Sequence, residues 1–366
     1  MAAARNFGLF IGLRIKHAGR PKNIQGTTSL PPVFLSGVLC RRPGRETGFR
    51  TPSRIMRASF SQIFDPASSP AAAISDLFKV VLIICAVILL IVASMIGISL
   101  IRFRHRPGAV EPQPYFGNRK LEIIWTVGPT VIVICLFALT ARGMRQIDPP
   151  ANQEPDLMVI GHQWWWEIRY PGTGVTTANE IHIPVGRQFL VRLESADVIH
   201  DFWVPALARK IQLIPGQTNH IWLAADAVGT YGGECAEYCG AQHAWMRFSV
   251  IAESPAEFEA WLDEQAKPAA FPASDSTQNG LKIFQTLTCI NCHSIRGVSV
   301  VANAAPDLTH LAGRQILGAG VLSNTETNLF SWLKDPQAFK PGCNMPNLKL
   351  TAAQVGALTG YLGSLK

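Results

Sequence analysis

Hydrophobic residues are concentrated in two long uncharged runs and then spread into short alternating segments. Residues 80–101 form an uncharged run of 22, and residues 123–140 form a second run of 18. A helix rises about 1.5 Å per residue, so the first run spans about 33 Å, enough to cross a bilayer. Pro129 lies inside the second run, where a membrane helix tolerates it. The pattern predicts a two-helix transmembrane hairpin over residues 76–142.

The loop between the two runs is basic and fixes the expected orientation. Against the single acid Glu111, it carries Arg102, Arg104, Arg106, Arg119 and Lys120. By the positive-inside rule such a loop is cytoplasmic. Everything after residue 142 is therefore expected on the periplasmic side of a bacterial inner membrane.

From about residue 150 the pattern changes to short segments rich in β-branched and aromatic residues, separated by Pro, Gly and Asn. Several short strands at this spacing indicate a β-sandwich or barrel. We expect an all-β domain over residues 150–265 that ends in a helix over 255–265. The expected strands cover residues 156–160, 162–170, 180–184, 188–193, 218–224 and 247–251.

A third unit follows a Pro- and Ala-rich linker at residues 266–274. Residues 275–366 are expected to be all-α, with a first helix over 277–288 and a last helix over 351–365, where apolar residues recur at helical spacing. The predicted fold class is therefore multidomain: a transmembrane hairpin, an all-β sandwich and a helical domain.

The net charge of +8 belongs to a tail. Residues 1–57 hold eleven Lys and Arg against one acid, Glu46, whereas the rest of the chain has a slight negative excess. This distribution removes the support for a nucleic-acid partner. Two interpretations of the tail stay open: a targeting segment, or an extended start whose translation begins at Met56.

Soft metal ligands gather near the middle of the chain. Cys235, Cys239, His243 and Met246 fall within twelve residues. Thiolate and thioether select copper, whereas a tetrahedral zinc site rarely recruits Met. A cupredoxin-type site also needs a ligand from an earlier strand, for which His200 is the candidate. Two neighbouring thiolates favour two bridged copper ions over a blue-copper centre, which uses one Cys.

With these residues and the aromatic run at 161–166, residues 60–265 resemble subunit II of haem-copper cytochrome c oxidases, with its dinuclear CuA centre. The resemblance implies a cupredoxin-like domain. It also implies that Glu237 supplies a backbone carbonyl to copper and a side chain to a magnesium ion shared with subunit I; a solvated loop acid is the alternative. The implied copper ligands are His200, Cys235, Glu237, Cys239, His243 and Met246.

The same resemblance assigns roles to two further residues. Trp164 matches the aromatic residue at which electrons arrive, although core packing would also explain it, and alternation would place Trp164 and Trp166 on one face. Glu122 matches an acid near the mouth of a proton-uptake path, and a favourable position at a helix N-terminus is the alternative. Gln212 and Gln217 depart from many relatives, which leaves the contacts to subunit I in doubt.

A second signature lies in the helical unit. Cys289, Cys292 and His293 form the C-x-x-C-H pattern of covalent haem c attachment. Met345, held between Pro341 and Pro346, is the candidate second axial ligand. The unit resembles a class I cytochrome c. In that resemblance Phe284 and Tyr361 pack where the terminal helices cross, and residues 306–308 line the haem pocket.

Together the two resemblances imply the electron-transfer subunit of a proton-translocating cytochrome c oxidase. An electron would pass from haem c to CuA and on to the haem-copper subunit I, which reduces oxygen to water. An external cytochrome c or a quinol-oxidising complex would supply the electron to haem c. The equivalent subunit of a nitric oxide reductase is the alternative. A copper chaperone would not need Met246, a haem or two membrane spans, and nitrous oxide reductase needs a His-rich second domain.

Overall fold

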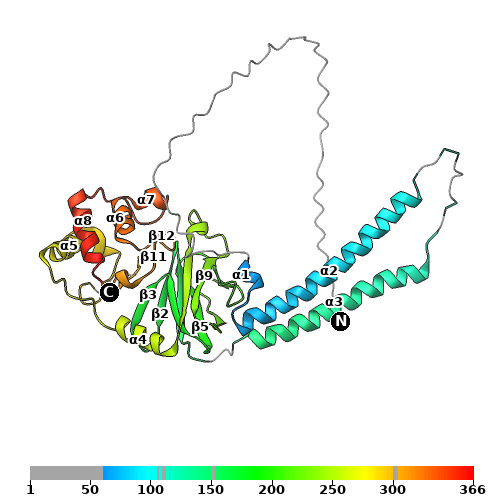
Figure 1. The fold of residues 1–366 in the computed structure, drawn as a ribbon, viewed down its shortest axis with the longest axis horizontal. Coiled ribbons are helices and arrows are strands. Elements are labelled where there is room, and N and C mark those ends of the chain that lie inside the picture. The colour runs from blue at the N-terminus through cyan, green and yellow to red at the C-terminus, as the bar shows by residue number, and fades with distance from the viewer. Residues whose placement is uncertain (1–60, 105–106, 109–112, 115, 150–152, 300–303) are drawn as a thin grey trace, which may run out of the picture. The chain divides into compact units, whose positions relative to one another are not determined.

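The computed structural model describes residues 61–104, 107–108, 113–114, 116–149, 153–299 and 304–366. The basic tail at residues 1–57 lies outside the described residues. Within them, a pair of long helices is followed along the chain by two β-sheets and then by a group of short helices (Figure 1). This is the multidomain architecture expected from the sequence.

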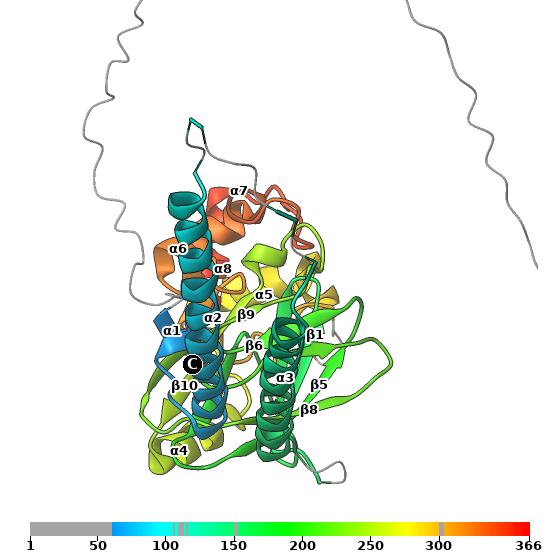
Figure 2. The same ribbon diagram turned by 90° about the vertical axis from the view of Figure 1, so that its right-hand side faces the viewer.

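The two predicted membrane helices are present and are longer than their uncharged runs. They are α2 (Ser69–Arg102) and α3 (Arg119–Ile147), preceded by the short α1 (Ser61–Phe64). Their most apolar windows have mean hydropathies of 3.2 and 2.2 and bury none of their residues. Figures 1 and 2 show them side by side. Apolar side chains exposed all round a helix are stable only in lipid, so the pair fits a membrane hairpin.

Capping and short contacts connect this hairpin to the β domain. Ser68 caps α2 by accepting a hydrogen bond from the amide of Ala71, and its hydroxyl donates to the Leu207 carbonyl at 2.5 Å. At the far end of α3, the carboxylate of Asp148 accepts a hydrogen bond from Arg209 at 2.6 Å. The start of α2 and the end of α3 are therefore each hydrogen-bonded to the β domain.

The β domain consists of two five-stranded sheets. One has the order β3-β2-β1-β5-β8 and the other β4-β10-β9-β6-β7. The β1–β5 and β4–β10 pairs are parallel and the others antiparallel. The strands are β1 (Leu157–His162), β2 (Trp165–Tyr170), β3 (Val175–Ala178), β4 (Glu180–Pro184), β5 (Phe189–Ser195), β6 (His200–Trp203), β7 (Ile211–Leu213), β8 (Asn219–Leu223), β9 (Gly229–Cys235) and β10 (Arg247–Glu253).

Side chains from both sheets form one apolar core. Trp166, Phe202 and Phe248 are fully buried in it, with ring centroids 4.7 to 5.9 Å apart. Gly233 makes room for this cluster, because a Cβ there would lie 2.2 Å from the Phe248 ring. The ring of His200 lies 6.0 Å from Trp166. The core therefore supports the strand ends at which the candidate metal ligands lie.

The expected strand over residues 162–170 is interrupted. Gln163 and Trp164 form the turn between β1 and β2, so strand alternation does not extend across them. Trp166 is fully buried in the core, whereas Trp164 is only partly buried. The expectation that Trp164 and Trp166 share one face is therefore wrong.

The C-terminal unit is built on crossing helices. In it, α5 packs across α8, and the rings of Phe284 and Tyr361 lie 6.2 Å apart, as expected. Gly280 permits the close crossing, because a Cβ there would lie 2.2 Å from the Ala357 carbonyl oxygen. The remaining elements are α4 (Pro255–Gln265), which closes the β domain, then α5 (Asp275–Thr286), η2 (Thr288–Asn291), η3 (Leu311–Gly313), β11 (Ile316–Leu317), β12 (Leu322–Ser323), α6 (Glu326–Lys334), α7 (Pro336–Phe339) and α8 (Ala352–Leu362).

Candidate metal centre

Strand ends and one connecting loop present the predicted copper ligands. His200 opens β6 and Cys235 closes the neighbouring strand β9. Cys239 lies in the loop that follows, and His243 begins the short helix η1 (His243–Trp245). Met246 directly precedes β10. Two paired strands thus fix two of the donors, and a loop of only eleven residues between β9 and β10 carries the others.

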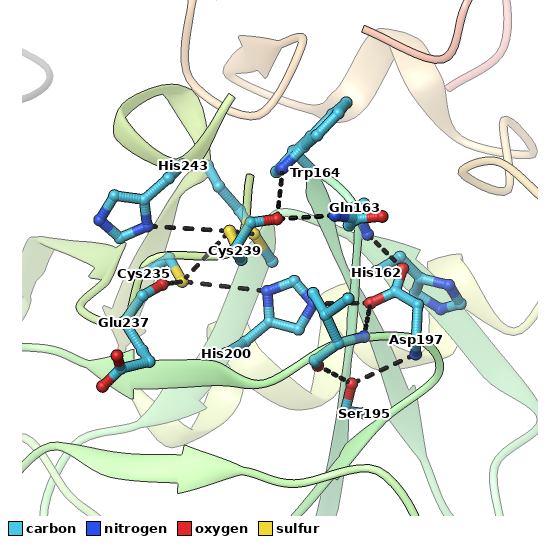
Figure 3. A network of polar contacts seen from close by, with 12 residues as sticks. His162, Gln163, Trp164, Ser195, Asp197, His200, Cys235, Glu237, Cys239 and His243 are labelled. Carbon is cyan, nitrogen blue, oxygen red and sulfur yellow. Dashed lines mark hydrogen bonds and ion pairs between the residues drawn. The ribbon is translucent and has the colours of Figure 1, made fainter. Parts of the chain in front are cut away.

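The donor atoms of His200, Cys235 and Cys239 lie within 4.8 Å of one another, and Figure 3 shows His243 beside them. The two sulfur atoms, Cys235 Sγ and Cys239 Sγ, lie 3.8 Å apart. An imidazole nitrogen flanks each sulfur: His200 Nδ1 is 3.9 Å from Cys235 Sγ, and His243 Nδ1 is 3.7 Å from Cys239 Sγ. Met246 Sδ lies 3.8 Å from Cys239 Sγ, and the Glu237 carbonyl oxygen lies 3.2 Å from Cys235 Sγ.

Most of the cluster is shielded from water. His200 and Met246 have no exposed surface, and the two cysteines are 5% and 3% exposed. His243 is partly exposed, with Tyr238 edge-on to its ring at 5.9 Å. One side of the cluster is therefore sealed by the sandwich, and the side at His243 is open.

Hydrogen bonding prepares the cluster for a cation. The neighbouring Cys239 thiol, as donor, holds the pKa of Cys235 far below its ordinary value despite burial. Burial lowers the pKa of His200, but its contacts with Cys235 and Asp197 outweigh this and raise it overall. Nε2 of His200 donates to Asp197 at 2.8 Å, which leaves Nδ1 free to bind a metal.

The donor set fits two copper ions. Two thiolates, two imidazoles and a thioether are soft or borderline ligands, which favour copper over magnesium or calcium. Each sulfur lies within 4 Å of a different imidazole nitrogen, so the two sulfurs and two imidazoles could together hold two metal ions. The Met246 thioether and the Glu237 carbonyl then stand at opposite sulfurs as weaker donors.

Gln163 and Trp164 hold the middle of the copper loop. The Gln163 amide donates to the Cys239 carbonyl at 2.7 Å, and the Trp164 indole donates to the same carbonyl at 3.0 Å. Gly240 makes this approach possible, because a Cβ there would lie 3.0 Å from both side chains. The predicted electron-input residue therefore contacts the ligand loop directly.

Two residues around the site escaped the sequence reasoning. Asp197 orients His200 and also accepts the backbone amide of Gln163 at 2.6 Å. A carboxylate three residues before a candidate ligand His was a usable signal, because metal-bound His commonly donates to one. Gln163 gave no such signal, because its role depends on the turn.

The haem-attachment residues form a second candidate site. Cys289 lies in η2, and Cys292 and His293 follow directly after this element. His293 Nδ1 donates to the Pro306 carbonyl at 2.7 Å, which leaves Nε2 available to iron and places Pro306, from the segment expected at the haem pocket, beside this ring. Met345 lies between α7 and α8, in a loop held by hydrogen bonds from Gln337. Cys289, Cys292 and His293 fit a covalently attached haem with a His ligand, and Met345 stays the candidate second ligand.

Two predicted acidic side chains, those of Glu122 and Glu237, lie apart from the copper donor atoms. Glu122 is in the first turn of α3, at the opposite end of that helix from Asp148. The Glu237 carboxylate turns away from its own carbonyl and lies 3.4 Å from the Gln212 amide. Gln212, one of the departures noted in the sequence, therefore contacts the acid expected at the magnesium site.

Comparison with known proteins assigns the family. Residues 58–141 match the family described as cytochrome C oxidase subunit II, transmembrane domain, and residues 173–253 match its periplasmic domain. Residues 277–366 match cytochrome c. Cytochrome c oxidase subunit 2 of Alkalihalophilus pseudofirmus is 35% identical over 87% of this chain and 98% of its own. The chain belongs to the cytochrome c oxidase subunit II family.

A second relative agrees with this assignment, and a solved structure is also similar in sequence. The subunit 2 of Bacillus sp. strain PS3 is 33% identical over 72% of this chain and 80% of its own length. The solved periplasmic domain of subunit II from Bradyrhizobium japonicum is 31% identical, and the match covers 31% of this chain and 95% of that one with a TM-score of 0.29. Membership of this family implies a membrane-anchored subunit II that partners a subunit I in an oxidase complex. The matched domains imply CuA copper and haem c.

Proposed function

We propose that this subunit II passes electrons from haem c to a dinuclear CuA centre and on to the haem-copper subunit I, where oxygen is reduced to water and protons are translocated. The observation that carries the proposal is the pair of cysteine sulfurs 3.8 Å apart, each flanked by its own imidazole. Sharing one electron between two bridged copper ions keeps bond lengths nearly constant, which suits transfer at small driving force.

The proposed ligand roles follow the donor geometry. Cys235, Cys239, His200 and His243 would hold the two copper ions. Met246 and the Glu237 carbonyl would supply weaker donors. In the helical domain, Cys289 and Cys292 would attach haem c, and His293 and Met345 would ligate its iron.

Trp164 is the proposed point at which electrons reach the copper loop. Its indole donates to the carbonyl of the bridging residue Cys239, which gives a direct contact with the metal ligands. Glu122 is the proposed proton-uptake acid on the cytoplasmic side, and the Glu237 carboxylate is proposed to share a magnesium ion with subunit I. The soluble domains are proposed to lie on the periplasmic side of a bacterial inner membrane.

Metal content and spectroscopy test the proposal. The complex purified with subunit I should contain two copper ions in the CuA centre and one covalent haem c per subunit II, with an EPR signal and near-infrared bands of a mixed-valence copper pair. Cys239→Ser should abolish both copper signatures, whereas Cys85→Ser in α2 should leave them unchanged. A copper signal that survives Cys239→Ser would show that the bridge is assigned wrongly.

Oxygen consumption tests the terminal acceptor. The complex supplied with a reduced electron donor should consume oxygen, and the Cys239→Ser complex should lose this activity although subunit I is intact. Reduction of nitric oxide but not oxygen by the unsubstituted complex would replace the oxidase by the nitric oxide reductase alternative.

A further inference from the structure

The segment that carries the candidate haem ligand lies against the candidate copper domain. We call residues 340–345 the docking loop; they follow α7 and end at Met345. The Asn344 side chain donates to the Gln163 carbonyl at 2.7 Å, and the Gln242 side chain donates to the Pro341 carbonyl. Both partners in the copper domain belong to segments that contact or contain the copper loop.

Lys340 joins the two domains through a buried ammonium group. It is only 4% exposed, and its Nζ lies 2.9 Å from the Trp164 carbonyl oxygen and 2.9 Å from that of Trp245. The third acceptor is the carbonyl of Gly318 in the helical domain, at 3.0 Å. A lysine ammonium has three donors, and all three are used here. Among the described residues, no carboxylate pairs with it, so backbone carbonyls alone offset its burial.

A second contact between the domains is independent of the docking loop. The Arg247 amide donates to the Ala319 carbonyl at 3.1 Å, and Ala319 packs with Trp165 and Ala178 in a small buried cluster. The buried Glu180 carboxylate accepts the backbone amide of Ile316 at 2.8 Å. The helical domain therefore has a built contact surface on the sandwich, in which Lys340 is the component next to the copper loop.

We propose that Lys340, supported by Asn344 and Gln242, is a positioning residue that docks the haem-carrying domain of this chain onto Gln163 and Trp164 for electron transfer to the copper pair. This inference rests on the proposed function. It adds which residues hold the haem domain in a fixed pose against Gln163 and Trp164.

The contacts define a short covalent and hydrogen-bonded route. From Met345 the chain continues to Asn344, whose side chain donates to the Gln163 carbonyl. The side chains of Gln163 and Trp164 both donate to the carbonyl of Cys239. With both groups bound, one electron would pass between these segments, so that the haem would lose one electron and the copper pair would gain one, with no proton or bond transferred.

The test compares Lys340→Met with Lys334→Met in the full oxidase complex. Methionine keeps the stem volume of Lys340 but removes its three donors, whereas Lys334 is an exposed lysine at the end of α6. Two readouts are used: the rate of electron equilibration between haem and copper after flash photolysis, and hydrogen exchange at the Arg247 amide, which bonds across the domains.

Lys340→Met should speed exchange of the Arg247 amide at least about tenfold, which corresponds to about 1.4 kcal/mol. It should also slow haem-to-copper equilibration, by the factor by which the docked fraction falls, because only the docked fraction transfers rapidly. Both optical spectra should stay unchanged. Lys334→Met should change none of these, and equal behaviour of the two variants would overturn the proposal.

Asn344→Ala tests the same docking contact and does not depend on whether Lys340→Met folds. Asn344 is exposed, so its truncation spares the core, and Asn279→Ala on α5 is the matched control. We expect Asn344→Ala to slow equilibration about threefold and Asn279→Ala to leave it unchanged; an unchanged rate in both overturns the route through Asn344. Missing copper or haem signals in the unsubstituted complex would instead overturn the proposed function.

Discussion

The imidazole of His200 rests directly on the backbone of Gly161: a Cβ at position 161 would lie 2.8 Å from Cδ2 of the ring. Gly161 lies in β1 of one sheet and His200 opens β6 of the other. The ring therefore lies between the Gly161 backbone, which has no side chain to displace it, and the carboxylate of Asp197. The orientation of this candidate ligand depends on a residue that offers no donor atom.

Gly161→Ala should therefore displace His200 and disturb the copper centre. We expect the copper affinity to fall about tenfold, the size of effect typical of groups that orient a ligand, and the copper hyperfine pattern in EPR to change. Gly313→Ala, where nothing lies within 4 Å of the added Cβ, is the control. Copper retention against a series of chelators measures the affinity, and an unchanged Gly161→Ala protein would show that the ring position does not matter.

Asp197→Asn should weaken the same ligand by a different route. Asp197 accepts hydrogen bonds from His200 and from the backbone amides of Gln163 and Val198. An asparagine has one acceptor oxygen and a donor amide, so one of these contacts becomes unfavourable. We expect about a tenfold to hundredfold loss of copper affinity. Asp263→Asn, at an exposed position on α4, should have no effect.

Gly280→Ala should destabilise the haem domain. The new Cβ would lie 2.2 Å from the Ala357 carbonyl and 2.5 Å from Cβ of Tyr361, so α5 and α8 must move apart. We expect a loss of about 3 kcal/mol in the free energy of unfolding. Gly356→Ala, on the open side of α8, should be neutral or stabilising by up to about 1 kcal/mol. Denaturant unfolding followed by haem absorbance distinguishes the two.

Glu180 should make the stability of the domain contact depend on pH. Burial raises the pKa of Glu180 from its ordinary 4.5 to about 7, although the amides of Ile316 and Gln315 and the charge of Arg314 oppose the shift. Between these values the folded protein holds more protons than the unfolded one, so stability is fully present below pH 4.5 and falls until pH 7.

Glu180→Gln should remove this dependence, because glutamine keeps an acceptor oxygen for the two amides but does not ionise. The stability of the variant relative to the parent should rise by up to about 3 kcal/mol as pH increases from 4.5 to 7, and then level off. Thermal unfolding across this range measures the difference. Glu259→Gln, at an exposed position on α4, should track the parent at every pH; a constant offset for Glu180→Gln would contradict the prediction.

The elements that the sequence predicted well are those whose signal is local. The uncharged runs predicted α2 and α3, and the helix at Pro255–Gln265 begins directly after Ser254, which forms a capping box with Glu257 in its first turn. The copper ligands were recognisable because four of them lie within twelve residues. Their donor atoms converge in the structure as that spacing suggested.

The features that the sequence did not reveal depend on tertiary contacts. The turn at Gln163 and Trp164 lies within an unbroken aromatic run that has the composition of a strand, so the break was not visible. The strand β9 contains Gly233, a poor strand former that is present because the Phe248 ring crosses above it. Lys340 had no local signal, because its acceptors are backbone carbonyls distant in sequence.

The linker between the two soluble domains, residues 266–274, is only nine residues long. Arg296 of the helical domain binds it at two points. Arg296 donates to the Ala266 carbonyl at 2.7 Å and accepts the Ala269 amide at 3.1 Å. A tether this short keeps its two ends at millimolar effective concentration. Under the proposed function, electron transfer from the tethered haem domain to the copper loop is a first-order process. Its rate would then not depend on the concentration of a diffusing carrier, which would affect only the re-reduction of the haem domain.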